Sequence, residues 1–109
     1  MRTLSFITVL LFCANLVAHA QKGKVTTAES LLLQRKFEKA KEVIDEAIKH
    51  ENCINYAKAH IVRGKIYQGI FEQDSILREQ FPDLLDVAWD EYQSAIKLDD
   101  KNRLEKELR

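Results

Sequence analysis

Three side chains of the kinds that bind metals or act as nucleophiles lie in the middle of the chain: His50, Cys53 and His60. A zinc site needs a fourth ligand and a characteristic spacing, and this group supplies neither. A cysteine nucleophile needs a histidine base and an orienting group held in a fixed geometry. Cys53 falls in a predicted turn, which holds such a geometry poorly. We therefore expect neither a metal site nor a catalytic thiol here.

Acidic pairs offer a second kind of chemistry, at Asp99-Asp100 and at Asp83 with Asp86. A calcium loop needs alternating oxygen ligands, a glycine and a terminal glutamate, and these pairs lack that pattern. The three glycines of the chain are too dispersed to form a phosphate-binding loop. Helix capping and helix-dipole contacts explain the acidic pairs well. We expect no enzymatic activity and no cofactor.

The composition favours a helical protein that is not a nucleic-acid binder. The chain has 109 residues, of which 46% are hydrophobic and 31% charged, with only three glycines and one proline. Few helix breakers and many Leu, Ala, Glu and Lys residues favour α-helix. Seventeen Lys and Arg balance seventeen Asp and Glu, so no positive excess is present to neutralise phosphates. One domain is the limit at this length.

The first twenty residues have the three parts of a secretory signal peptide. Arg2 precedes an apolar run, and the run ends in Ala18-His19-Ala20. This pattern predicts cleavage between Ala20 and Gln21 and export from the cytoplasm to the periplasm or beyond. An uncleaved membrane anchor is the alternative, but polar residues interrupt the run and a stable span needs about 20 predominantly apolar residues. Lipid attachment at Cys13 is disfavoured because bulky Phe12 precedes it.

Cleavage would leave a mature domain of residues 21–109, with no stable membrane span and with Cys53 as its only cysteine. A lone cysteine cannot form an internal disulfide. We expect a free, half-buried thiol, with an intermolecular disulfide as the alternative.

Apolar residues recur at steps of three and four throughout residues 21–109, which predicts an all-α domain. The expected helices cover residues 25–34, 37–50, 56–71 and 83–98, and a further helix begins at 102. Thr26 with Glu29 fits a capping box, and Asn55 is a predicted N-cap. Asp99-Asp100 is expected to break the fourth helix. Trp89 lies on the stripe of that helix and is expected in the core.

Two of these helices share a spacing of small and large residues. Ala40, Ile44 and Ala47 match Ala88, Tyr92 and Ala95. Small residues seven apart lie on one face, two turns apart, so a neighbouring helix can approach closely there. Gly64 costs its helix about 1 kcal/mol relative to alanine, which suggests close packing against a crossing helix.

This pattern resembles the tetratricopeptide repeat family, in which a repeat of about 34 residues forms a helix–turn–helix. Residues 21–54 resemble one repeat and residues 57–102 a second, with an insertion at 72–83. The residues on family packing positions are Ala40, Ile44, Ala47, Gly64, Tyr67, Ala88, Tyr92 and Ala95. The chain departs from the family at Lys24 and His60, where an aromatic is expected, and it lacks the closing proline. With its leader, it is similar to exported bacterial members of the family. The resemblance implies a short α-solenoid of antiparallel helix pairs.

The resemblance also implies a binding face for a protein or peptide partner. Carried over to this chain, that face comprises Lys58, Ile61, Lys65 and Gln68, with Val25, Glu29 and Leu32 on the preceding repeat. We therefore expect a non-catalytic interaction module acting outside the cytoplasm. The alternative is self-association, or a piece of a longer array, because two repeats are few and Leu104 and Leu108 begin an uncovered apolar face. A small exported enzyme is less favoured, since no acid–base set converges.

Overall fold

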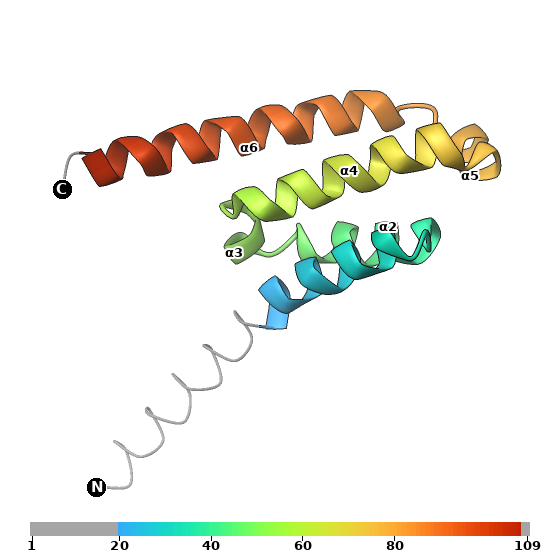
Figure 1. The fold of residues 1–109 in the computed structure, drawn as a ribbon, viewed down its shortest axis with the longest axis horizontal. Coiled ribbons are helices and arrows are strands. Elements are labelled where there is room, and N and C mark those ends of the chain that lie inside the picture. The colour runs from blue at the N-terminus through green and yellow to red at the C-terminus, as the bar shows by residue number, and fades with distance from the viewer. Residues whose placement is uncertain (1–19, 108–109) are drawn as a thin grey trace, which may run out of the picture.

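The chain is described by a computed structural model, which covers residues 20–107 except the side chains of Leu104 and Glu105. Residues 1–19 of the predicted signal peptide and Leu108 lie outside the described residues. The prediction of an all-helical chain is confirmed, because the described residues form helices joined by short turns (Figure 1). The elements are an N-terminal helix, described over residues 20–33, then α2 (Phe37–Ala47), α3 (Glu51–Ile54), α4 (Ala57–Gln73), α5 (Ser75–Gln80) and α6 (Leu84–Glu107).

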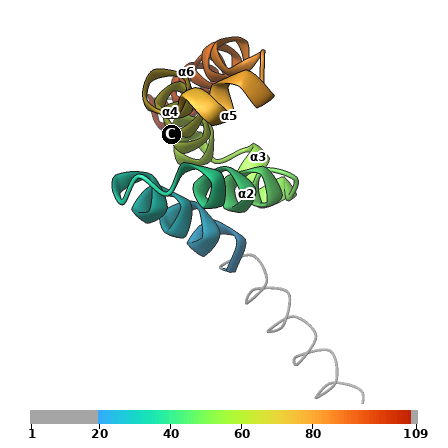
Figure 2. The same cartoon turned by 90° about the vertical axis from the view of Figure 1, so that its right-hand side faces the viewer.

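The long helices lie in layers with α4 in the middle. On one side α4 packs against α6, and on the other it faces α2 and the N-terminal helix, with successive long helices running in opposite directions (Figures 1 and 2). The core between these layers is made of branched aliphatic residues and alanines. Its fully buried large side chains are Val25, Ile44, Cys53, Val62, Ile66, Ile70 and Leu84. Val25 was expected on an exposed binding face, and that expectation is wrong because its side chain is 0% exposed.

The helix α2 follows the predicted apolar stripe. Phe37, Ala40, Ile44 and Ala47 are its buried residues, at steps of three and four. The helix ends three residues earlier than the predicted limit, His50, and the short helix α3 occupies most of the expected connection. The predicted N-cap Asn55 is wrong, because Asn55 ends α3 and Tyr56 precedes α4.

Thr26 is not a cap either, since the helix is already formed at residue 20 and Thr26 lies in its interior. Asp74 does cap a helix, as its carboxylate accepts a hydrogen bond from the Leu77 backbone nitrogen at 3.0 Å at the start of α5. Residues 72–83, the predicted insertion, are therefore the end of α4, the short helix α5 and the turn before α6.

The break at Asp99-Asp100 does not occur, because α6 continues through both residues to Glu107 and no separate helix begins at 102. An aspartate in a helix interior costs only about 0.7 kcal/mol relative to alanine, far less than proline. The start of α6 at Leu84 lies one residue from the predicted start at residue 83, just after Pro82.

The predicted turn at Arg35-Lys36 closes with two backbone hydrogen bonds. Arg35 N donates to Leu32 O and Lys36 N donates to Leu31 O, each at 2.9 Å, which is the Schellman pattern. Arg35 occupies the left-handed position of this motif, with φ of 60°. Most proteins place glycine at that position, because a Cβ is strained there.

Replacing Arg35 by glycine is expected to stabilise the protein by about 0.5–1 kcal/mol, since the exposed arginine loses only strain. Urea unfolding followed by circular dichroism measures this gain. The matched change Gln34→Gly, one residue earlier where φ is not positive, is expected to destabilise. Equal effects of the two changes would contradict the strained turn.

Candidate interaction surface

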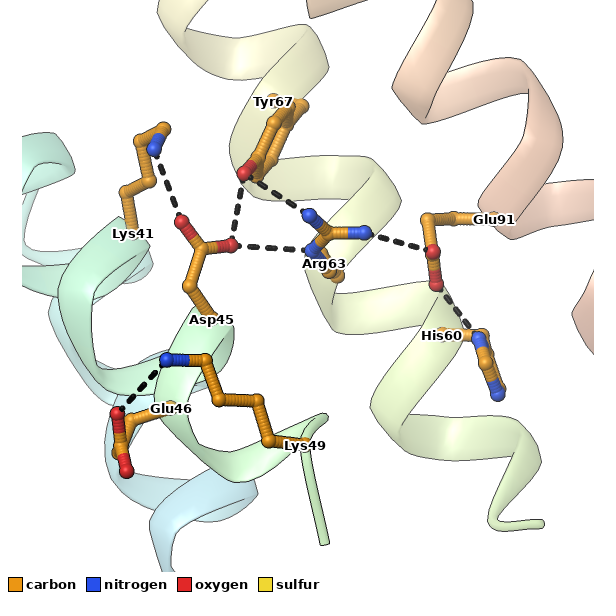
Figure 3. Close-up of polar contacts among 8 residues, drawn as sticks. All are labelled: Lys41, Asp45, Glu46, Lys49, His60, Arg63, Tyr67 and Glu91. Carbon is orange, nitrogen blue, oxygen red and sulfur yellow. Dashed lines mark hydrogen bonds and ion pairs between the residues drawn. The ribbon is translucent and has the colours of Figure 1, made fainter. Parts of the chain in front are cut away.

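Arg63 on α4 joins the helices on both sides of it. Its Nε donates to Asp45 Oδ1 on α2 at 3.0 Å, and its Nη1 donates to Glu91 Oε1 on α6 at 2.8 Å (Figure 3). The side chains of Arg63 and Glu91 are 21% and 11% exposed. Hydrogen-bonded ion pairs shielded from water in this way are stronger than surface pairs, and losing one partner leaves an uncompensated charge. The guanidinium therefore ties three helix layers together.

Asp45 receives further donors on α2 and α4. Lys41 Nζ donates to its Oδ2 at 2.9 Å, and the Tyr67 hydroxyl donates to its Oδ1 at 2.7 Å (Figure 3). Burial alone would raise the pKa of Asp45, but the hydrogen bonds from Lys41, Tyr67 and Arg63 outweigh it, so this pKa lies below its ordinary value. The ionised carboxylate thus stabilises the fold above the unfolded-state pKa, and that contribution is lost as pH falls through the native pKa.

His60 extends the cluster to the start of α4. Its Nε2 lies 2.6 Å from the backbone oxygen of Ile54, and its Nδ1 lies 2.6 Å from Glu91 Oε2. A carbonyl oxygen only accepts, so Nε2 carries a proton and donates it. The second contact needs another proton, carried by the imidazole or by the Glu91 carboxyl. Both ring nitrogens are therefore occupied by contacts within the chain.

The acidic, basic and phenolic groups of this cluster are bonded to one another, and each holds a neighbour in place. That arrangement suits a structural clamp rather than proton transfer to a substrate. Across residues 20–107, with side chains 104 and 105 set aside, no three His, Cys, Asp or Glu side chains gather as a metal would require. Cys53 is a free thiol, fully buried, and burial raises its pKa, so the reactive thiolate is disfavoured.

Sequence reasoning missed this cluster, although a signal for it exists in the helix period. Glu91 lies between Ala88 and Ala95 at steps of three and four, on the face that α6 buries. On α4, His60, Arg63 and Tyr67 recur at steps of three and four in the same way, and His60 and Tyr67 are buried. Charged residues at core positions of two neighbouring helices indicate a buried pair, because an unpaired charge there would be too costly.

The predicted partner-binding residues on α4 are only partly free. Lys58 Nζ lies 3.5 Å from Glu29 Oε1 on the N-terminal helix. Gln68 accepts a hydrogen bond from the Tyr92 hydroxyl at 2.7 Å and donates one to Glu72 at 3.0 Å. Ile61 is half-buried and Lys65 is exposed. Two of these four side chains therefore already have contacts within the chain.

The repeat-packing residues lie at the contacts between layers. Ala40, Ile44, Ala47, Gly64, Tyr67, Ala88 and Ala95 are buried, and Tyr92 is half-buried. At Gly64 the ring of Tyr92 on α6 comes so close that a Cβ would lie 2.7 Å from its Cε1 atom.

The outer face of α6 exposes large apolar side chains. Trp89 is 65% exposed, Leu85 45% and Ile96 53%. The expectation that Trp89 packs in the core is wrong. The apolar residues of α6 cover a wide arc of the helix, and α6 buries the part of that arc with Leu84, Ala88 and Ala95 and exposes the part with Trp89. Each residue rotates the helix by about 100°, so these three exposed side chains lie within about 40° of one another on one line. We call this line the α6 apolar stripe.

The hollows of the molecule lie along α2 rather than α6. One of about 280 Å³ is lined by Lys24, Thr27, Glu42, Val43 and Glu46. Another of about 120 Å³ adjoins the ion cluster and is lined by Glu38, Lys41, Glu42, Asp45, Leu77, Gln80 and Phe81. Both contain lysine and carboxylate side chains. Three of the six exposed large apolar side chains of the described residues lie on the α6 apolar stripe.

Within residues 20–107, none of the helices combines the length and the apolar character that crossing a bilayer needs. Comparisons with protein-family models, with curated proteins and with solved structures give no match to this chain.

Proposed function

We propose that this chain is a non-catalytic protein-interaction module that binds a helix through the α6 apolar stripe. The observation that carries the proposal is the 65% exposure of Trp89, on one line with the exposed Leu85 and Ile96. Tryptophan dominates interaction hot spots because it combines a large apolar area with few rotatable bonds. Apolar anchors repeated along one helix face suit the helix-in-groove and helix-on-helix modes of recognition.

The rigidity of α6 supports this role. Arg63 and His60 on α4 both contact Glu91 in the middle of α6, and Tyr92 bonds Gln68 on α4. These contacts fix α6 on α4, so the stripe is presented without ordering a flexible segment on binding. Preorganisation of this kind lowers the entropic cost of association.

We also propose that the module belongs to an exported protein built of two tetratricopeptide-like repeats. The signal-peptide pattern up to Ala20 supports export. The alternation of the long helices and the small residues between their layers support the repeat arrangement. In such an array α6 is the second helix of the second repeat, and its outer face carries the α6 apolar stripe.

Site-specific photocrosslinking in the native cell tests the proposal. A photoreactive benzoylphenylalanine replaces Trp89 on the stripe, with exposed Lys39 on α2 as the matched control position and Lys65 on α4 as a probe of the alternative face. We expect discrete protein adducts from position 89 and none from position 39. Adducts from position 65 alone would move the binding surface to α4. The absence of adducts from both 89 and 65 would overturn the interaction role.

A further inference from the structure

Four exposed charges along one side of the α6 apolar stripe are ordered by sign, and Asp100 is a further acidic residue between the stripe and the lysines. Asp86 and Asp90 lie beside its first half, and Lys97 and Lys101 beside its second half. All four side chains are exposed. At about 100° per residue they lie within about 60° of one another, so they form one edge of the stripe.

On α6 itself Asp86 and Asp90 have no cation three or four residues away, whereas Lys97 lies three residues before Asp100 and Lys101 four residues before Glu105. Asp86 and Asp90 are four residues apart and repel, as do Lys97 and Lys101. None of the four takes part in an ion pair among the residues whose side chains are described. The helix dipole favours this order of signs, but its effect falls off within the first and last turn. Asp90 and Lys97 lie between the first and the last turn of α6, so the dipole does not account for them.

An antiparallel copy of the same helix would pair these charges. Asp90 and Lys97 are equally distant from the midpoint between Gln93 and Ser94, and so are Asp86 and Lys101. In a two-fold contact the same edge of each helix meets. Each aspartate then faces a lysine of the second copy, whereas in a parallel two-fold contact this edge would meet the opposite edge of the second helix.

The apolar stripe has nearly the same centre. Trp89 and Ile96 are equally distant from the midpoint between Tyr92 and Gln93, one residue from the centre of the charges. One residue is about 1.5 Å along a helix, so a single antiparallel register can satisfy both sets. Trp89 would then pack on Ile96 of the second copy.

We propose that the partner of the α6 apolar stripe is a second copy of this chain, bound with the two α6 helices antiparallel. This inference rests on the proposed interaction role of the same stripe. The apolar part of the stripe spans about three turns, so the contact is at the small end of specific interfaces and we expect a dissociation constant in the micromolar range, on the order of 10 μM. Salt should weaken the dimer, because exposed charge pairs are screened.

Two complementary charge variants test the register. One carries Asp86→Lys and Asp90→Lys, and so presents only positive charge along the edge. The other carries Lys97→Asp and Lys101→Asp, and presents only negative charge. Each protein is expressed from the full-length chain, its N-terminus is read by mass spectrometry, and its association is measured by sedimentation velocity. We expect each variant alone to dimerise about tenfold more weakly than the wild type, and an equimolar mixture to form a heterodimer at least as tight as the wild-type dimer.

Thermal melting controls for folding, since all four positions are exposed and the variants should melt like the wild type. A wild-type chain that stays monomeric at about 100 μM, tenfold above the expected dissociation constant, would overturn the inference. So would variants that do not associate on mixing. If the wild type is monomeric but position 89 still crosslinks to a different protein, self-association fails while the interaction role stands. If it is monomeric and yields no adduct at positions 89 and 65, both fail.

Discussion

Replacing Arg63 by methionine is expected to lower the free energy of unfolding by about 3 kcal/mol, the lower end of what breaking a buried ion pair costs. Asp45 and Glu91 would lose the donor that bridges them across α4, and both would stay shielded from water without it. For a domain of this size the melting temperature should fall by roughly 4–8 °C for each kcal/mol. Urea unfolding and thermal circular dichroism measure the two quantities.

The matched control is Arg103→Met on the exposed end of α6. Arg103 lies 3.5 Å from Asp100, but its side chain is 70% exposed, so we expect a change within about 0.5 kcal/mol. A second change, Glu91→Gln, should recover part of the loss in the Arg63→Met protein, because an amide needs no guanidinium beside it and can still bond His60. If Arg63→Met and Arg103→Met cost the same, the cluster does not hold the layers together.

Replacing Gly64 by leucine is expected to destabilise the protein by about 2 kcal/mol or more, the cost of overpacking a close contact. A Cβ at this position would lie 2.7 Å from Tyr92 Cε1, and the hydroxyl of that ring is tied to Gln68. The higher helix propensity of leucine offsets about 1 kcal/mol of the steric cost. Thermal unfolding monitored by circular dichroism gives the difference.

A double-mutant cycle separates this clash from a general effect on the helix. In a Tyr92→Ala chain, Gly64→Ala should stabilise by about 1 kcal/mol, since helix propensity acts without the clash. In the wild-type chain the same change should destabilise. Gly23→Ala serves as the control in an open position, where nothing lies within 4 Å of the added carbon, and it should not destabilise. The same sign for Gly64→Ala in both backgrounds would show that Tyr92 is not the obstacle.

Local sequence signals predicted the helices well where one physical cause dominates. The stripe from Phe37 to Ala47 places its apolar side chains on one face, and burial of that face is sufficient to define α2. The start of the fourth predicted helix, at residue 83, lies within one residue of Leu84, where α6 begins, because Pro82 excludes helix just before it. These effects act within one or two turns, so they can be predicted from neighbouring residues.

The errors arose where the local signal was weak or ambiguous. Asp99-Asp100 has low helix propensity, but the cost is small beside that of breaking a helix, and α6 runs on to Glu107. The apolar stripe that includes Leu84 and Trp89 is wider than one contact can bury. Periodicity therefore indicates that α6 is amphipathic, but it does not say which edge of the stripe meets α4.

The ion cluster could not be predicted by pairing neighbours along the chain. Lys41, Asp45 and Lys49 are spaced as attractive pairs on one helix, a pattern typical of a solvated helix face. The structure instead brings Arg63 to Asp45 and Glu91, on helices that are far apart in sequence (Figure 3). Only the packing of α2 and α6 on opposite sides of α4 creates that juxtaposition.

By itself the sequence determined that the chain is helical and roughly where most helices begin and end, because helix formation depends on propensity, capping and periodicity within a few residues. The tertiary structure decided what lies inside. It buried Val25 and the Arg63 cluster, and it left Trp89 in contact with solvent. Those outcomes depend on the rotation of each helix about its axis, which is set by the fit of its side chains against the neighbouring layers.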